Sequence, residues 1–236
     1  MTDYNPSMHR RLFLATALAL MATVSAVPHA QPSDSSESKR LRDATSVLTE
    51  IMSADDKSIP ESIIGKAEGI AVFPSTIKAG LVVGGTRGRG VLSARTASGW
   101  SSPAFLTLTG GSIGLQIGGE SADIVLLIMQ RRGLETLVRN QFKLGVDAGV
   151  AAGPVGRDTQ ASTDLQLRAE ILSYSRARGA FAGVTINGST VRGDRDANQR
   201  FYGKPYEMAD LVLQGQGDTR APVPDWLMLL TRYAHP

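Results

Sequence analysis

The chain has 236 residues, of which 42% are apolar and 20% charged, an ordinary composition for a soluble protein with one sizeable core. Its 25 basic residues exceed its 22 acidic residues by only three, which is too little to indicate a nucleic-acid-binding protein. There is no cysteine, so disulfides, thiolate nucleophiles and Cys-ligated metals are excluded, and the histidines are His9, His29 and His235. We therefore expect no metal site, no cofactor and no enzymatic activity.

Residues 1–30 have the pattern of a secretory signal peptide, with a basic start, an apolar run at residues 12–24 and small residues after it. The apolar run is shorter than the roughly 20 residues that a membrane-spanning helix needs. We expect cleavage after Ala26 or Ala30. The mature protein is thus predicted to be periplasmic or secreted, either in solution or peripheral to a membrane.

A polar linker at residues 31–38 precedes what we interpret as a single domain at residues 39–236. Residues 39–56 have the apolar spacing of an amphipathic helix, with Ser38 as a candidate N-cap. Basic residues cluster in the first turn of this predicted helix. Its apolar stripe can pack on the domain or lie on an anionic membrane, and the pattern leaves both open.

A glycine-rich stretch at residues 65–119 follows a short predicted helix at residues 60–68 and holds 13 of the chain's 25 glycines. Between the glycines are short runs of Val, Ile, Leu, Phe and Thr, which are typical of strands joined by tight turns. Because glycine permits bulges and close backbone approach, this stretch predicts a curved sheet.

The rest of the chain alternates between strand and helix patterns. The expected elements are a buried strand at 122–129, a helix at 131–141, a strand at 144–158, three strands within 169–194, two helices within 197–214 and a helix at 222–233. Asn187-Gly188 is a hairpin signal that we expect to join the last two of these strands. The sequence therefore predicts an α+β fold, in which a mostly antiparallel, curved or barrel-like sheet is flanked by N- and C-terminal helices.

Residues 84–90, GGTRGRG, resemble a phosphate-binding loop but lack the ending of a Walker A motif, and a strand pattern rather than a helix pattern follows. We interpret them as the turn of a glycine-rich hairpin with Arg87 and Arg89 at its tip. Two arginines placed in this way can contact a lipid phosphate.

Ser75-Thr76-Ile77-Lys78 matches the S-x-x-K motif of penicillin-recognising serine enzymes. That chemistry requires the serine at the start of a helix and two partner motifs, and neither partner motif is present. A serine hydrolase using Ser75 and Lys78 is therefore a remote alternative.

Eight strings together resemble the SYLF domain, a family with SH3-containing actin-patch members and plant FYVE members. They occur in the family's order and cover residues 59–203. The strings are KAEGIAVF, IKAGLVVGG, GRGVLSAR, GWSSPAF, IGLQIGGESADIVLLI, LGVDAGVAAGPVGR, ILSYSRARGAFAGVTINGS and NQRFYG.

The resemblance implies a non-catalytic lipid-binding module that prefers phosphoinositides in eukaryotes, with actin binding implied only by the yeast-type members. Together with the signal peptide, which is a departure from the family, it predicts for this chain an exported protein that binds anionic phospholipid headgroups at a membrane surface. An envelope protein-interaction or structural module, with an envelope protein as its partner, is the alternative. Lysine-rich N-terminal helices bind lipid in some eukaryotic members, and the corresponding helix here carries Lys39, Arg40 and Arg42.

The candidate lipid-binding residues are basic residues on this helix, on the predicted hairpin and in the family's K-A-G and G-P-x-G-R strings. They are Lys39, Arg40, Arg42, Lys78, Arg87, Arg89 and Arg157.

Overall fold

We describe the fold from a computed structural model of the chain. It describes residues 35–54, 58–80, 83–113, 118–139, 141–155, 169–177, 180–181, 186–218, 220 and 222–234. Residues 34–236 form one compact unit. The predicted signal peptide lies outside the described residues.

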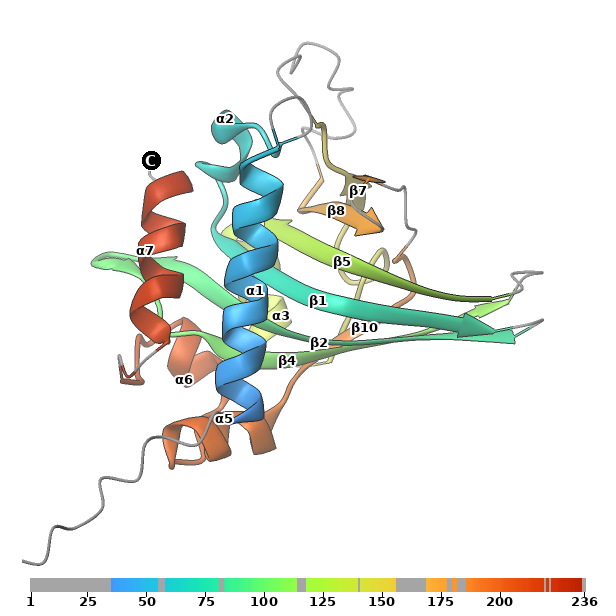
Figure 1. The fold of residues 1–236 in the computed structure, drawn as a ribbon. Helices are drawn as coiled ribbons and strands as arrows, with labels where there is room; N and C mark the ends of the chain where they lie inside the picture. Colours follow the sequence, from blue (N-terminus) through green and yellow to red (C-terminus); the bar gives the residue numbers. More distant parts are fainter. Residues whose placement is uncertain are drawn as a thin grey trace, which may run out of the picture. The chain divides into compact units, whose positions relative to one another are not determined.

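One curled sheet organises the described part of the chain (Figure 1). Its long strands are β1 (Gly69–Gly80), β2 (Val83–Thr96), β4 (Ala104–Ile113) and β5 (Gly118–Ile128). Its short strands are β3 (Gly99–Trp100), β6 (Phe142–Lys143), β7 (Val150–Ala152), β8 (Ile171–Ala177), β9 (Ala180–Phe181) and β10 (Thr190–Gly193). The strand order is β6-β10-β4-β2-β1-β5-β8-β7, with β3 paired to β2 and β9 to β8. All pairs are antiparallel except β7 with β8, so the predicted curved, mostly antiparallel sheet is confirmed.

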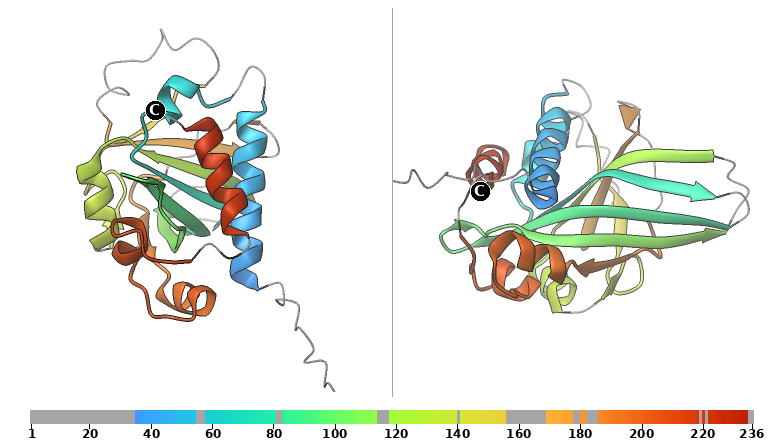
Figure 2. Two further views of the ribbon diagram at one scale, coloured as in Figure 1. Left: turned by 90° about the vertical axis from the view of Figure 1, so that its left-hand side faces the viewer. Right: turned by 60° about the horizontal axis from the view of Figure 1, so that its bottom comes forward.

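Helices cover both faces of one end of this sheet. They are α1 (Ser36–Met52), α2 (Glu61–Ile64), α3 (Arg131–Arg139), α5 (Arg195–Tyr202), α6 (Met208–Val212) and α7 (Val223–Tyr233). In the right-hand view of Figure 2, α1 and α7 lie on one side of the sheet and α3, α5 and α6 on the other. No helix in the described ranges is both long enough and apolar enough to cross a membrane.

Helix α1 begins three residues earlier than the sequence pattern indicates. The hydroxyl of Ser35, rather than Ser38, is the N-cap, and it accepts a hydrogen bond from the Ser38 backbone N–H at 3.1 Å. The apolar stripe, which includes Leu41, Leu48 and Ile51, is fully buried against the sheet and α7. The stripe is therefore part of the core rather than a free membrane-binding surface.

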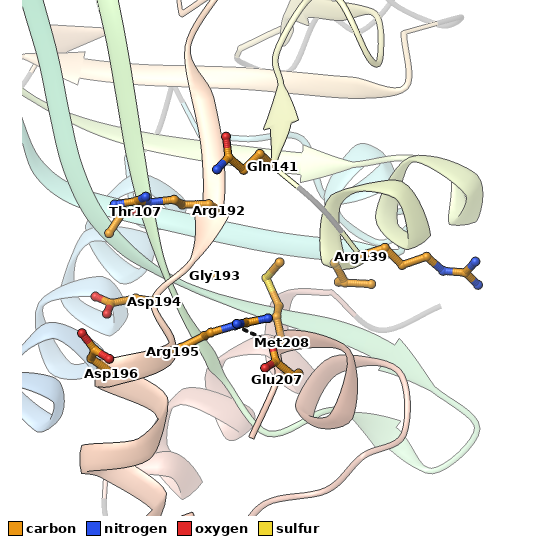
Figure 3. Close-up of a pocket in the computed structure, with 11 residues that line it drawn as sticks. Thr107, Arg139, Gln141, Arg192, Gly193, Asp194, Arg195, Asp196, Glu207 and Met208 are labelled. Atoms are coloured by element: carbon orange, nitrogen blue, oxygen red, sulfur yellow. Dashed lines mark hydrogen bonds and ion pairs between the residues drawn. The ribbon is translucent and has the colours of Figure 1, made fainter. Parts of the chain in front are cut away.

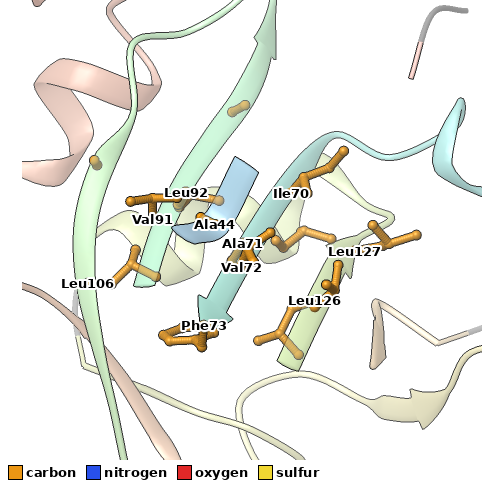
Figure 4. Close-up of a cluster of buried hydrophobic side chains, with 14 of the residues drawn as sticks. Ala44, Ile70, Ala71, Val72, Phe73, Val91, Leu92, Leu106, Leu126 and Leu127 are labelled. Atoms are coloured by element: carbon orange, nitrogen blue, oxygen red, sulfur yellow. The ribbon is translucent and has the colours of Figure 1, made fainter. Parts of the chain in front are cut away.

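The core fills the helix-covered end of the sheet, where β1, β2 and β5 are buried on both faces (Figure 4). Ile70, Val72, Val91 and Leu126 are among its fully buried residues. At about 25 cal/mol per Å² of buried apolar surface, this two-sided burial is the main stabilising contribution to the fold. The α+β class with flanking terminal helices is confirmed.

Beyond the helices, the four long strands continue as a sheet extension that we call the arm, comprising residues 76–80, 83–90, 107–113 and 118–122 (Figure 1). Where their burial is described, residues of the arm alternate between a buried or half-buried inner face and a more exposed outer face. The outer face is the continuation of the face that α1 covers, since Arg87, Arg89 and Val91 lie on the same side of a regular strand.

The prediction that GGTRGRG forms a turn is wrong, because these residues lie inside β2. The inner-face glycines are required by packing rather than by a turn. A Cβ at Gly88 would stand 2.5 Å from the Thr76 hydroxyl oxygen, and one at Gly90 would stand 2.4 Å from the Val72 carbonyl oxygen. Side chains are excluded there because the neighbouring strand β1, which is bulged between Val72 and Ile77, lies too close to these positions.

Two further predictions about strands are wrong. Asn187-Gly188 does form a turn, with Gly188 at a φ of 82°, but β9 pairs with β8 whereas β10 pairs with β4 and β6. Within residues 144–155, the described part of the expected strand at 144–158, only β7 is a strand, because a turn precedes it; residues 156–158 lie outside the described residues. In that turn the Asp147 carboxylate accepts the backbone N–H of Lys143 at 2.6 Å.

Candidate functional site

The outer face of the arm presents basic and small side chains in two cross-strand rows. In the first row, Arg192 of β10 is opposite Thr107 of β4, which is opposite Arg89 of β2. The second row runs from β6 to β5 and comprises Lys143, Thr190, Thr109, Arg87, Ile77 and Ser121. Directly opposed residues in an antiparallel pair point to the same face. We call Arg87, Arg89, Arg192 and Lys143 the basic face.

The charges of the basic face are spread both along one strand and across the sheet. The Cα atoms of Arg87 and Arg89 are about 7 Å apart along the strand, and Arg192 lies about 10 Å from Arg89 across two strand spacings. All four basic side chains are exposed. Among the described residues none of them forms an ion pair, so their charge is not neutralised locally.

The next row toward the end of the arm, beyond Arg87 and Ile77, carries almost no side chains. Ala79 is opposite Gly85 and Gly119, and Gly85 is opposite Gly111. A Cβ at Gly111 would meet nothing within 4 Å, so packing does not require glycine there. The adjacent Ile77 side chain is 57% exposed. Among the residues whose exposure is described, the outer face therefore combines several cations with small side chains and the exposed Ile77.

The candidate residues on α1 have a different environment. Lys39 forms an exposed ion pair with Asp43 at 2.7 Å. Arg40 is buried, donates to the Asp194 carboxylate at 3.1 Å and stacks over the Phe105 ring at 5.3 Å. Since Asp194 also caps α5, the Arg40 side chain connects α1 to α5 and faces the protein interior rather than a ligand. Arg42 is exposed.

The remaining two candidate residues are not part of the basic face. Lys78 is half-buried and is in register with Thr86 and Glu120, on the opposite face of the sheet from Arg87. Arg157 lies outside the described residues.

The S-x-x-K motif does not have the geometry that serine-enzyme chemistry requires. Ser75 and Lys78 belong to strand β1 and not to a helix start. Ser75 lies in a β-bulge with a φ of 48°, and its backbone N–H donates to the Asp123 carboxylate at 2.9 Å. Asp123 in turn accepts a hydrogen bond from Arg176, so these residues have a structural role in the bulge.

A groove of about 530 Å³ lies beside the basic face, where β10 leads into α5 and faces α3 and α6 (Figure 3). Arg192 and Thr107 belong both to the groove and to the basic face. Val138 and Met208 supply apolar lining, and the remaining lining is largely charged. The groove is within the size range of small-molecule sites.

Sequence reasoning missed Arg192 and Lys143 as members of the basic face. The period-two pattern of β10 signals that Arg192 is on an exposed side of a strand. No local signal shows that this strand pairs with β4, whose sequence position is about 85 residues earlier, so the juxtaposition with Arg89 emerges only from the fold.

Comparison with known proteins identifies the family. A family model described as Ysc84, Las17-binding protein actin regulator, matches residues 109–233, which is more than half of the chain. The chain belongs to the Ysc84 family. The resemblance to the SYLF domain is thereby confirmed.

Curated relatives extend the likeness over most of the chain. The chain is 35% identical over 191 residues to SH3 domain-containing YSC84-like protein 1 of Homo sapiens, covering 79% of this chain and 55% of that protein. It is 32% identical over 165 residues to LAS seventeen-binding protein 3 of Saccharomyces cerevisiae, covering 68% of this chain and 36% of that protein. The match thus spans 55% of the length of the human relative and 36% of that of the yeast relative. The family description names binding and regulation, and the yeast relative is named for binding.

Proposed function

We propose that this member of the Ysc84 family is a non-catalytic protein that binds anionic phospholipid headgroups at a membrane surface through the basic face. The observation that carries the proposal is the set of exposed cations on the outer face of the arm, none of which forms an ion pair with a described residue. The family description, which names binding and regulation, and the yeast relative's name, which names binding, support a binding role over a catalytic one.

The energetics of the basic face suit reversible membrane attachment. Each Lys or Arg held near an anionic membrane surface contributes about 1 kcal/mol. Arg87, Arg89 and Arg192 would then contribute roughly 3 kcal/mol together, and the fork of each guanidinium can contact phosphate oxygens in a bidentate manner. The exposed Ile77 adds an apolar contact at the same face.

The predicted export of the protein sets the context of this proposal. A signal peptide at residues 1–30 would place the domain in the periplasm or outside the cell, where the bilayer surface available to it carries anionic phospholipids. A protein-interaction module is the second candidate, and it is favoured by the relatives named for binding Las17.

Vesicle co-sedimentation of residues 31–236 tests the proposal. This fragment contains the compact unit that begins at residue 34 and lacks the apolar run at residues 12–24, which could enter a bilayer itself. We expect retention on vesicles containing phosphatidylglycerol and little retention on phosphatidylcholine alone. Because the attraction is Coulombic, retention should fall steeply between about 0.05 and 0.5 M salt.

Two outcomes oppose the proposal. Equal retention on anionic and neutral vesicles would show that charge does not drive binding. Stoichiometric capture of one envelope protein, together with no vesicle retention at any salt concentration, would favour the interaction module.

A further inference from the structure

One edge of the arm is open where β4 continues beyond β10 (Figure 1). β4 pairs with β2 as far as Ile113, whereas its pairing with β10 ends at Thr109. The chain that leads into β10 turns away from β4, because the Gly188 N–H donates to the Leu144 carbonyl at 2.7 Å. Among the described residues, none pairs with residues 111–113 on the side away from β2.

The backbone groups of Gly111 and Ile113 point toward this open edge. Phe105 shows the direction, since its carbonyl accepts the Asp194 N–H at the end of β10 and its own N–H donates to the Asn198 side chain, both at 2.8 Å. The register of β4 with β2 is continuous from residue 104 to residue 113. Because successive residues of a strand direct their N–H and C=O groups to opposite sides, every second residue after 105 faces away from β2.

The open edge lacks the features that usually prevent strands from pairing there. Exposed edges are commonly protected by lysine, proline or a bulge. Residues 110–113 are Gly-Gly-Ser-Ile, and their register with β2 has no shift. Gly111 is exposed, and a Cβ added to it would meet nothing within 4 Å. The backbone of β4 is therefore accessible to a further strand.

Two cations of the basic face flank the position opposite Gly111. With about 4.8 Å between strands and about 3.4 Å between residues, that position lies about 8 Å from the Lys143 Cα and about 12 Å from the Arg87 Cα. A residue opposite Gly111 would present its side chain on the outer face, where both cations are exposed. An acidic side chain at that position is attracted, whereas a basic one is repelled.

We infer that the open edge of β4 binds an extended segment of another protein that carries acidic side chains at alternate positions. The segment would add an antiparallel strand in line with β10 and exchange backbone hydrogen bonds with Gly111 and Ile113. A second copy of this chain is disfavoured as the occupant, because pairing two β4 edges would bring two basic faces together. The inference goes beyond the proposed function, since it assigns the backbone of β4 to a protein partner.

Nuclear magnetic resonance of ¹⁵N-labelled residues 31–236 tests the inference with the synthetic peptide acetyl-TEVETEV-amide. We expect the peptide to shift the amide signals of Gly111 and Ile113 and to slow their hydrogen exchange, because these N–H groups gain acceptors. The Ser112 N–H faces β2 and should change less. The matched peptide acetyl-TKVKTKV-amide should bind about tenfold more weakly.

N-methylation of the three glutamates separates backbone pairing from charge attraction. In an antiparallel strand these residues lie opposite Gly111 and Ile113, so their N–H groups point toward β4. The methylated peptide keeps its charge, loses these donors and should bind about tenfold more weakly. Equal binding of the two peptides would show that charge alone attracts the peptide, and it would overturn the inference.

Variants of the protein test the same contacts. Gly111→Pro removes an N–H that faces the open edge and none that faces β2, so it should remain folded by circular dichroism and lose peptide binding. The double variant Arg87→Gln, Lys143→Gln should weaken binding roughly three- to tenfold. Its matched control, Arg132→Gln, Arg232→Gln, removes two exposed cations from α3 and α7 and should leave binding unchanged.

The remaining outcomes decide between occupants. Absence of any shift at Gly111 and Ile113 would overturn the inference. Dimerisation of the protein alone that competes with the peptide would also overturn it, in favour of a second copy. Gly111→Pro keeps every cation of the basic face and should keep its retention on phosphatidylglycerol vesicles. Failure of the peptide to bind would therefore leave vesicle retention, and hence the proposed function, intact.

Discussion

The basic residues of α1 and those of the basic face carry the same charge but differ in what they contact. On α1, Lys39 is paired with Asp43, and Arg40 is buried against Asp194 and Phe105. On the arm, Arg87 and Arg89 are exposed, and no described acidic residue pairs with them. A cluster of basic residues in a sequence therefore does not indicate a binding surface until the partners of each cation are known.

The largest effect that this comparison predicts is a loss of stability when Arg40 is replaced. Arg40→Gln leaves the partly buried Asp194 carboxylate without its cation, and we expect the free energy of unfolding to fall by about 2–4 kcal/mol. Arg87→Gln, which removes an exposed cation, should change it by less than about 0.5 kcal/mol. Urea unfolding of both variants measures the difference. Equal stability of the two variants would refute the structural role given to Arg40.

The inner and outer faces of the arm should also differ in the loss of stability caused by adding a side chain. Gly90→Ala places a Cβ against the backbone carbonyl of Val72 and should cost about 1–3 kcal/mol. Gly85→Ala, on the outer face, would meet only the Gly110 carbonyl oxygen at 3.9 Å and should change stability by less than about 0.5 kcal/mol. Thermal unfolding followed by circular dichroism gives both values. A Gly90→Ala variant as stable as wild type would show that the inner face is not closely packed.

A smaller, pH-dependent effect is expected where α1 contacts α5. Burial raises the pKa of Glu37, but the hydrogen bond from Arg200, hydrogen bonds from the Glu37 backbone and Ser36, and the Arg200 charge together outweigh this effect, so the pKa of Glu37 is below its ordinary value. A carboxyl group with a lowered folded-state pKa stabilises the fold at neutral pH, and this stabilisation is lost as the pH falls through that pKa.

Unfolding of wild type and Glu37→Gln across pH checks this linkage. We expect wild type to be more stable by about 1 kcal/mol at pH 7, a modest value because the Arg200 side chain is 57% exposed. The difference should begin to shrink below the ordinary glutamate pKa of 4.5 and should disappear as the pH falls through the lowered pKa of the folded state. A difference that is constant from pH 7 to pH 3 would contradict the assignment.

Local patterns in the sequence predicted the elements of this fold better than they predicted its site. Three features of the fold follow from local signals and are present in the structure. They are the glycine-rich curved sheet, the helix with the apolar stripe of Leu41, Leu48 and Ile51, and the C-terminal helix beginning near Pro222. Glycine was misinterpreted at residues 84–90 because turns and close strand packing both favour it. Only the contacts of Gly88 and Gly90 distinguish the two causes.

The candidate site depended on tertiary contacts that the sequence does not display. Arg40 was predicted as a lipid-binding residue because its neighbours Lys39 and Arg42 are basic, yet its partner Asp194 is more than 150 residues away. Arg192 was missed for the converse reason, since its place beside Arg89 follows from the pairing of β10 with β4. The sequence shows which residues are charged, but it does not show which of them form ion pairs in the folded protein.

The central claim is that the arm, rather than α1, attaches the protein to anionic membranes, and vesicle affinity after matched charge removal tests it most directly. Arg87→Ser, Arg89→Ser and Lys39→Ser, Arg42→Ser each remove two exposed cations from residues 31–236. We predict that the first pair weakens binding to phosphatidylglycerol vesicles by roughly 2 kcal/mol, about 30-fold, and the second pair by no more than about threefold. Equal losses, or a larger loss in the α1 pair, would contradict the account.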